Sequence, residues 1–203
     1  MPDFSIRIDR ASSDSTKWNK YQDHDVIPFW VADMDFAAPD FVLEALHERI
    51  DHGILGYAEP QSELVDAACK WFWHRFNWKV DPDWLIWIPG VVPGLNIASR
   101  AIGSDGDALI IMTPVYPPFL SVPENSDKQM LRSPLLYDGA RWIMDFADIG
   151  DKARLASGLL LSNPQNPTGR VYSENELSKL ANICLANDVV VVSDEIHWGI
   201  VLD

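Results

Sequence analysis

The second half of the chain alternates between continuous apolar runs and segments with a helical pattern. The apolar runs are ALIIMTP at 108–114, LASGLLLSNP at 155–164 and VVVVSDEIH at 189–197. Runs of this length without polar alternation are typical of strands buried on both faces of a parallel sheet. Between the last two, SENELSKLANICLAND predicts a helix with a capping box, in which Ser173 is the N-cap and Glu176 the third residue.

The first half predicts two helices, one strand and a third helix start. Apolar residues share one face of FVLEALHERIDHG, with Asp40 as the cap and Gly53 as the end. SELVDAACKWFWHRF predicts a second helix with Ser62 as its N-cap. WLIWIP at 84–89 predicts a strand, and the Gly-rich turn after it opens into a helix at GVVPGLN.

The alternation of strands and helices predicts an α/β fold with an open, mostly parallel, doubly wound sheet covered on both faces. In such sheets ligands bind beyond the carboxyl ends of the strands. The loops that follow the predicted strands are GVVPG, TPVYPP, SNPQNPTG and SDEIHWG, and TPVYPPF predicts a loop stiffened by proline. RSPLLYDGARWIMDF predicts a meander or a hairpin with its turn at Asp138-Gly139. Residues 1–35 predict an extended arm.

Composition and charge narrow the classes of function. The 203 residues are 47% hydrophobic and 23% charged, which is typical of a globular protein with a real core. A net charge of −14 argues against a nucleic-acid or membrane-surface partner. No apolar run has the length of a membrane span, and the N-terminus has no signal-peptide core. Cys69 and Cys184 exclude a disulfide scaffold and suit the cytoplasm, where we expect the protein.

SNPQNPTG at 162–169 is the segment at which a family resemblance becomes clear. It resembles the N-P-x-N-P-T-G loop of class I/II aminotransferase-like enzymes, which use pyridoxal 5′-phosphate (PLP). SDEIH follows it, and WVADMDFAAP, GYAEP, GVVPGLNIA and TPVYPPF occur in the family's expected order. VADMDF and DEIH look most like the cystathionine β-lyase branch of the carbon–sulfur lyases.

The resemblance implies a fold and a division of the chain. The fold is the large domain of the PLP-dependent transferases (fold type I), here truncated. Residues 1–38 correspond to an N-terminal arm or part of the small domain, and residues 39–203 to a partial PLP-binding large domain.

The resemblance also assigns contacts with the PLP ring. PLP drains electrons from the Cα of an amino acid into its pyridine ring, so the ring nitrogen must stay protonated. The family places the acid that does this at Asp194. Asn166 matches the amide that donates to the phenolic oxygen, and Tyr116 matches the aromatic residue that stacks on the ring. Each also has a structural alternative: a strand-end Asp, a turn-stabilising Asn and a packed loop Tyr.

Further cofactor contacts follow from the same resemblance. Val91 and Val92 match positions whose N–H groups bind the PLP phosphate, at a helix start that favours anions. His197 stands near the phenolic oxygen, where aminotransferases usually carry Tyr, and the alternative is a surface His. Tyr57 matches a residue that reaches the phosphate of a neighbouring subunit, which implies a homodimer of the full-length protein; its alternative is a packed loop Tyr. Trp198 departs from the small residue common in the branch.

On the substrate side, the resemblance points to Trp30 and Ala32. Asp33 and Asp35 form a carboxylate pair, but we expect them to hold loop structure because PLP enzymes use a lysine as base. We expect no metal site, because the histidines have no cysteine or histidine partner at metal-ligand spacing.

The implied activity is β-elimination from an amino-acid thioether such as cystathionine or a cysteine S-conjugate, giving a thiol, pyruvate and ammonia. In the family, the lysine that holds PLP and removes the Cα proton lies in an S-x-x-K segment after the DEIH strand. We therefore expect it beyond Asp203, no catalytic residue within the chain, and an incomplete enzyme. An aminotransferase on the same scaffold, an inactive fragment and a non-catalytic aminotransferase-like domain stay open as alternatives.

Overall fold

The computed structural model describes residues 3–11 and 13–201. The chain packs as two compact units, Met1–Leu64 and Val65–Asp203. The boundary predicted after residue 38 separates the N-terminal arm from the PLP-binding large domain of the family fold. It does not refer to these two units and stays a prediction. Among the described residues, no helix is both long and apolar enough to cross a membrane.

The first unit is built around two helices, α1 (Thr16–Asn19) and α2 (Asp40–Asp51). Asp40 was predicted to cap α2, but it is the first helical residue, because the chain enters the helix through Pro39 and no side chain caps it. Gly53 lies just after the helix with φ +74°, as expected for a left-handed helix end.

The junction between the units falls within helix α3 (Ser62–Phe76). Ser62 was predicted as its N-cap, but it is the first residue of the helix. Its hydroxyl donates to the neighbouring Glu63 carboxylate, 3.0 Å away, and so makes no cap.

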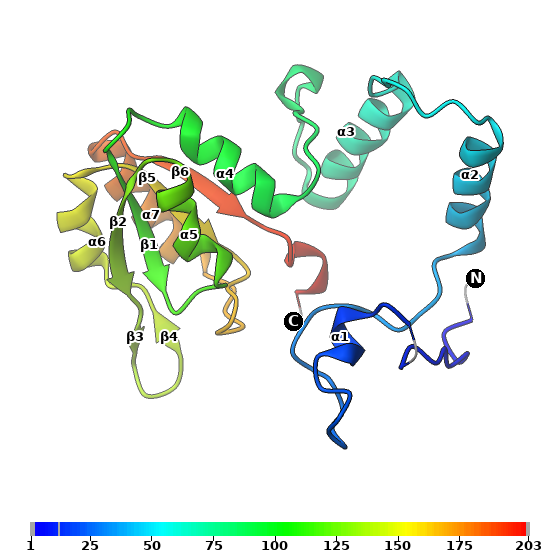
Figure 1. Cartoon of the computed structure of the whole chain (residues 1–203). Helices are drawn as coiled ribbons and strands as arrows, with labels where there is room; N and C mark the ends of the chain where they lie inside the picture. Colours follow the sequence, from blue (N-terminus) through cyan, green and yellow to red (C-terminus); the bar gives the residue numbers. More distant parts are fainter. Residues whose placement is uncertain (1–2, 12, 202–203) are drawn as a thin grey trace. The chain divides into compact units, whose positions relative to one another are not determined.

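The second unit contains a parallel four-stranded sheet, which confirms the predicted fold class. The strand order is β2 (Gln129–Pro134), β1 (Ala108–Thr113), β5 (Ala156–Ser162) and β6 (Val190–Asp194), and every neighbouring pair is parallel (Figure 1). The three apolar runs of the sequence are therefore the strands β1, β5 and β6. Parallel pairing brings the carboxyl ends of all four strands to one edge of the sheet.

Helices cover both faces of this sheet, and the strands alternate between the two cores. One core is formed with α4 (Val91–Ala101) and α5 (Pro118–Asn125), and the other with α6 (Phe146–Ala153) and α7 (Glu174–Ala186). The buried residues of the first core are Leu95, Leu109, Ile111, Phe119, Val122 and Leu160. Those of the second include Ile110, Met112, Ile149, Leu159, Leu161, Leu180 and Cys184. The burial of β1 and β5 on both sides explains why their sequences are continuously apolar.

Two local predictions are confirmed by hydrogen bonds. Ser173 and Glu176 form the capping box of α7. The short antiparallel strands β3 (Leu136–Tyr137) and β4 (Trp142–Ile143) form the predicted hairpin, which projects beyond the end of β2 (Figure 1). In its turn, the Asp138 carboxylate accepts the N–H groups of Ala140 and Arg141, both at 2.9 Å.

Two predictions about loops and strands were wrong. WLIWIP is not a strand: Pro82–Trp84 forms the short 3-10 helix η1, and no described strand pairs with residues 85–89. A strand needs a hydrogen-bonded neighbour, and here Ile86 is 82% exposed. TPVYPPF is a loop only in its first part, because α5 begins at Pro118. Proline is well tolerated at a first helical position.

Strand β6 is less covered than its apolar sequence suggests. Val190 and Val191 are exposed, whereas Asp194 at its carboxyl end is buried. The chain then turns into the short 3-10 helix η2 (Trp198–Ile200).

Candidate functional site

The predicted site in the second unit rests on three adjacent strand ends. Tyr116 follows β1, Asn166 follows β5, and Asp194 ends β6. In the ladder between β5 and β6, Ser162 stands opposite Asp194, and the next backbone N–H, that of Asn163, donates to the Asp194 carbonyl oxygen at 3.0 Å. The pairing of the strands therefore fixes the start of the Asn166 loop against Asp194.

Asp194 provides a buried carboxylate at this edge. Asp194 is only 8% exposed, and its Oδ1 accepts a hydrogen bond from the N–H of Ile196 at 3.1 Å. Asp194 and Val91 line the same hollow, of about 510 Å³. Its apolar wall contains Phe72, Trp78, Ile88, Leu95 and Val192. The hollow, which Glu195 also lines, thus combines two acidic residues with largely apolar surroundings.

Helix α4 begins beside the same hollow, which its first residue, Val91, lines. The helix begins at Val91 after Gly90, whose φ of +128° is disfavoured for residues with a side chain. The N–H of Gly94 already bonds to the Gly90 carbonyl oxygen, at 3.1 Å. The N–H groups of Val91 and Val92 belong to the first helical turn and have no acceptor within the helix. They are therefore suited to bind an anion.

Asn166 and His197 line a second hollow, of about 400 Å³. The Asn166 backbone N–H donates to the Ser162 hydroxyl at 3.3 Å. The side chains of Asn166 and His197 make no hydrogen bond to another residue in the described ranges. Tyr116 is 41% exposed and lines neither hollow. Of the six predicted residues in this unit, Val91 and Asp194 thus line one hollow, Asn166 and His197 line another, and Val92 and Tyr116 line neither.

The segment after Asp194 is held by aromatic packing. The Trp198 ring lies 5.8 Å from that of Trp71 and 5.0 Å from that of Phe76, both edge to face. Such pairs contribute about 0.5–1.5 kcal/mol each beyond their buried area. Trp198, which departs from the family pattern, thus joins the segment that carries His197 to helix α3.

The other three predicted residues, Trp30, Ala32 and Tyr57, lie in the first unit. The Trp30 indole N–H donates to the Lys17 carbonyl oxygen at 3.1 Å, and the Lys20 ammonium lies 4.0 Å from the Trp30 ring centroid. Ala32 and Tyr57 are exposed, Tyr57 completely.

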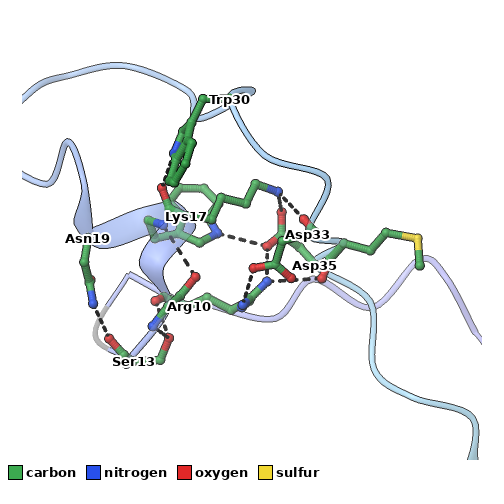
Figure 2. A network of polar contacts seen from close by, with 10 residues as sticks. Arg10, Ser13, Lys17, Asn19, Trp30, Asp33 and Asp35 are labelled. Atoms are coloured by element: carbon green, nitrogen blue, oxygen red, sulfur yellow. Dashed lines mark hydrogen bonds and ion pairs between the residues drawn. The ribbon is translucent and has the colours of Figure 1, made fainter. Parts of the chain in front are cut away.

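Figure 2 shows that Asp33 and Asp35 are the centre of a charged network. Arg10 donates to Asp33 Oδ2 at 2.8 Å and to Asp35 Oδ1 at 2.9 Å. Lys17 donates to Asp35 Oδ2 at 2.6 Å and to the Asp33 carbonyl oxygen at 2.8 Å. The Trp18 indole N–H adds a bond to Asp35 Oδ1 at 2.9 Å.

These donors keep both carboxylates ionised. The hydrogen bonds from Lys17 and then Trp18 lower the pKa of Asp35 to about 2, and the bond from Arg10 lowers the pKa of Asp33. A general base or acid needs a pKa nearer the working pH. The network therefore holds the Trp30–Asp35 segment, as predicted for these acids, and is not suited to proton transfer.

Sequence reasoning missed the residues that connect these segments. Arg10, Lys17 and Trp18 fix the Trp30–Asp35 segment, and Gln165 joins two of the strand-end loops. Gln165 lies inside the recognisable SNPQNPTG loop, but no motif marks the other three residues, because their partners lie far away in the chain. Within the described ranges, no three His, Cys, Asp or Glu side chains group as metal ligands do.

A three-layer parallel α/β unit with polar loops at the carboxyl ends of its strands defines a ligand-binding domain of the doubly wound class. The family model for aminotransferases of class I and II matches residues 24–203, so the chain belongs to this family.

Three proteins illustrate the similarity. Cystathionine beta-lyase PatB of Bacillus subtilis is 42% identical over 205 residues, covering 98% of this chain and 53% of that protein. Protein MalY of Escherichia coli is 32% identical, covering 98% of this chain and 54% of its own. The structure of cystalysin from Treponema denticola, which contains a PLP cofactor, superposes with a TM-score of 0.90 at 34% identity, over 100% of this chain and 54% of that one. The chain thus spans about half the length of the curated relatives it matches.

The network in Figure 2 predicts how Asp35 titrates. Because its pKa in the folded chain lies below the ordinary 3.8, the ionised form stabilises the folded segment above that pH, and this stabilisation is lost as the pH falls through about 2. Replacing Lys17, the largest cause, by Met should raise the midpoint toward 3.8. The measurement is an NMR titration of the Asp35 carboxyl carbon. Lys70→Met, which removes an exposed lysine 3.9 Å from Asp66, is the control and should leave the midpoint near 2. A midpoint near 4 in the unaltered, folded protein would contradict the network.

Proposed function

We propose that the intact protein is a PLP-dependent carbon–sulfur β-lyase and that this chain supplies most of its cofactor site. The observation that carries the proposal is that the buried Asp194 shares one edge of the sheet with the loops of Tyr116 and Asn166, in a chain that is 42% identical to a cystathionine beta-lyase. The crystal structure of cystalysin, which contains PLP, supports the cofactor.

The donor and acceptor groups of the second unit fit the chemistry of PLP. The cofactor has a protonated ring nitrogen, an ionised phenolic oxygen and a phosphate. Asp194 supplies a carboxylate acceptor in an apolar wall, Asn166 supplies an amide donor, and the N–H groups of Val91 and Val92 supply an anion site. The Asn166 amide has no other hydrogen-bond partner in the described part of the chain, which favours a ligand role over turn stabilisation.

When bound, PLP supplies an electron sink for the bonds at the substrate Cα. Asp194 would hold the proton on the ring nitrogen by a charge-assisted hydrogen bond. Asn166 would donate to the phenolic oxygen and stabilise its ionised form, with His197 in the same hollow. Tyr116, whose ring is partly exposed at the adjoining loop, would cover one face of the cofactor ring. Trp30 and Ala32 would line the substrate side.

Elimination also needs a base that removes the Cα proton. No lysine lines either hollow of the described second unit. In the family that the chain resembles, the base is a lysine of an S-x-x-K segment after the DEIH strand, and we assign the base to such a lysine after Asp203. Residues 1–203 are therefore proposed to bind and orient the cofactor and the substrate. The proton transfer is assigned to a lysine outside these residues.

The test uses the intact protein with PLP and cystathionine. We expect pyruvate, detected with lactate dehydrogenase, in the absence of any 2-oxo acid acceptor. Asp194→Asn should weaken PLP binding, because losing a charge-assisted bond costs about 1.5–3 kcal/mol, which corresponds to roughly a 10- to 150-fold change. Asp127→Asn, an exposed aspartate beside the opposite end of the sheet, should leave binding unchanged. Product formation only after addition of a 2-oxo acid would contradict the lyase activity and show that the protein is an aminotransferase instead.

We further infer a homodimer that works in the cytoplasm. Tyr57 matches a family residue that reaches the phosphate of a neighbouring subunit, and its complete exposure within its unit favours a contact outside that unit. Cys69 and Cys184 are both free thiols, which suits a reducing compartment.

A mixed-dimer experiment tests the role of Tyr57. Tyr57→Ala and Asp194→Ala should each be strongly impaired alone. If Tyr57 completes the partner's site, a mixed dimer contains one site with both changes and one unchanged site. Random mixing should then restore roughly a quarter of the full pyruvate-forming activity. No recovery after unfolding and refolding the two variants together, with recovery of the unaltered protein as control, would show that Tyr57 acts within its own subunit or not at all.

A further inference from the structure

Gln165 is a buried polar side chain in the middle of the Asn166 loop. The residue is only 3% exposed, although glutamine is usually a surface residue. A buried amide must find partners for both its N–H and its carbonyl groups, or the fold loses stability. The hydrogen-bond partners of the Gln165 amide therefore indicate what holds the loop in place.

The two ends of the amide bind two different loops. Its Nε2 donates to the Pro114 carbonyl oxygen, 2.6 Å away in the loop after β1. Its Oε1 accepts the backbone N–H of Thr168 at 2.8 Å and also the Thr168 hydroxyl. One bond thus reaches across 51 positions of sequence to the loop of Tyr116, and the others close the loop that contains Asn166.

Backbone bonds make the Asn166 loop rigid around the same residue. The Gln165 N–H donates to the Arg170 carbonyl oxygen at 2.6 Å, and the Gly169 N–H donates to the Gln165 carbonyl oxygen at 2.8 Å. The Arg170 guanidinium bonds to both carboxylate oxygens of Glu176, at 2.7 and 2.6 Å. The loop is therefore anchored to α7, and the Gln165 side chain is the connection from this anchored loop to the Tyr116 loop.

We propose that Gln165 is a positioning residue that fixes Tyr116 and Asn166 relative to each other, and so sets the orientation of the PLP ring between them. This inference rests on the proposed function. Gln165 itself need not touch the cofactor. It acts by keeping Pro114, two residues before Tyr116, at hydrogen-bond distance from the loop of Asn166.

Gln165→Glu is the sharpest variant, because it keeps the size of the side chain and an acceptor for Thr168. It replaces the donor to Pro114 by an oxygen that repels the carbonyl. Gln165→Leu removes both connections. Gln129→Glu is the matched control, because Gln129 is exposed at the amino end of β2, away from both loops.

The first measurement is a PLP titration of the intact protein, followed by visible circular dichroism at saturating PLP. We expect Gln165→Glu to bind PLP roughly tenfold more weakly and to change the circular-dichroism band, which reports the orientation of the ring. A change in general stability alone would not alter that band at saturation. Lowering the pH should partly restore the band in Gln165→Glu only, because a protonated carboxyl can again donate to Pro114. Affinity and band equal to those of the unaltered protein would overturn the proposal.

A second measurement separates this inference from the proposed function. Hydrogen–deuterium exchange of the PLP-free protein should be faster in Gln165→Leu, in peptides covering both 113–119 and 163–170, with no change in Gln129→Glu. If the unaltered protein binds no PLP, the proposed function fails, and the exchange experiment still shows whether Gln165 joins the loops. Unchanged exchange in both peptides would rule out the connection.

Discussion

The parallel pairing of β1, β5 and β6 is the constraint on which the rest of the site depends. Parallel strands end at one edge, so the residues that follow each strand are brought together whatever their separation in sequence. Here the ladder places Ser162 opposite Asp194, and the next hydrogen bond joins Asn163 to the Asp194 carbonyl oxygen. A shift of one residue in this register would turn the side chain at the strand end to the other face of the sheet.

The strand ends alone do not hold a ligand-binding loop in one conformation. In this chain the loops are connected by side chains that contribute no reactive group. Gln165 joins the loop after β5 to the loop after β1, and Trp198 packs the segment after β6 against α3. In the first unit Arg10 and Lys17 do the same for the segment from Trp30 to Asp35. The residues proposed to bind the cofactor or the substrate are thus different from these four residues, which hold the segments in place.

The sequence was most informative where a pattern is local. The runs that became β1 and β5 are apolar because helices cover both faces of the sheet there, and the capping box of α7 is a contact between Ser173 and a residue three positions later. Such features can be predicted because their partners are close by or their environment is uniform.

The errors occurred where the outcome depends on distant partners. WLIWIP has the composition of a strand, but no described strand pairs with it. Helix α5 was predicted as a loop because its segment contains several prolines. The full burial of Phe119 and Val122 against the sheet stabilises the helix. The bond from Gln165 to Pro114 could not be predicted either, since it exists only after β1 and β5 have paired. The sequence thus predicted which loops meet, and the structure adds what holds them together.

If the strand-end groups form a PLP site at the carboxyl edge of the sheet, binding of PLP should perturb those groups directly. The most direct test is NMR of the protein labelled with ¹⁵N at valine and asparagine, recorded during a titration with PLP. We expect shifts of the Val91 and Val92 amides and of the Asn166 side-chain amide, with no shift at Asn187 and Val189, which precede β6 at the opposite edge. Shifts confined to Asn187 and Val189, or none at saturating PLP, would contradict a PLP site at the carboxyl edge.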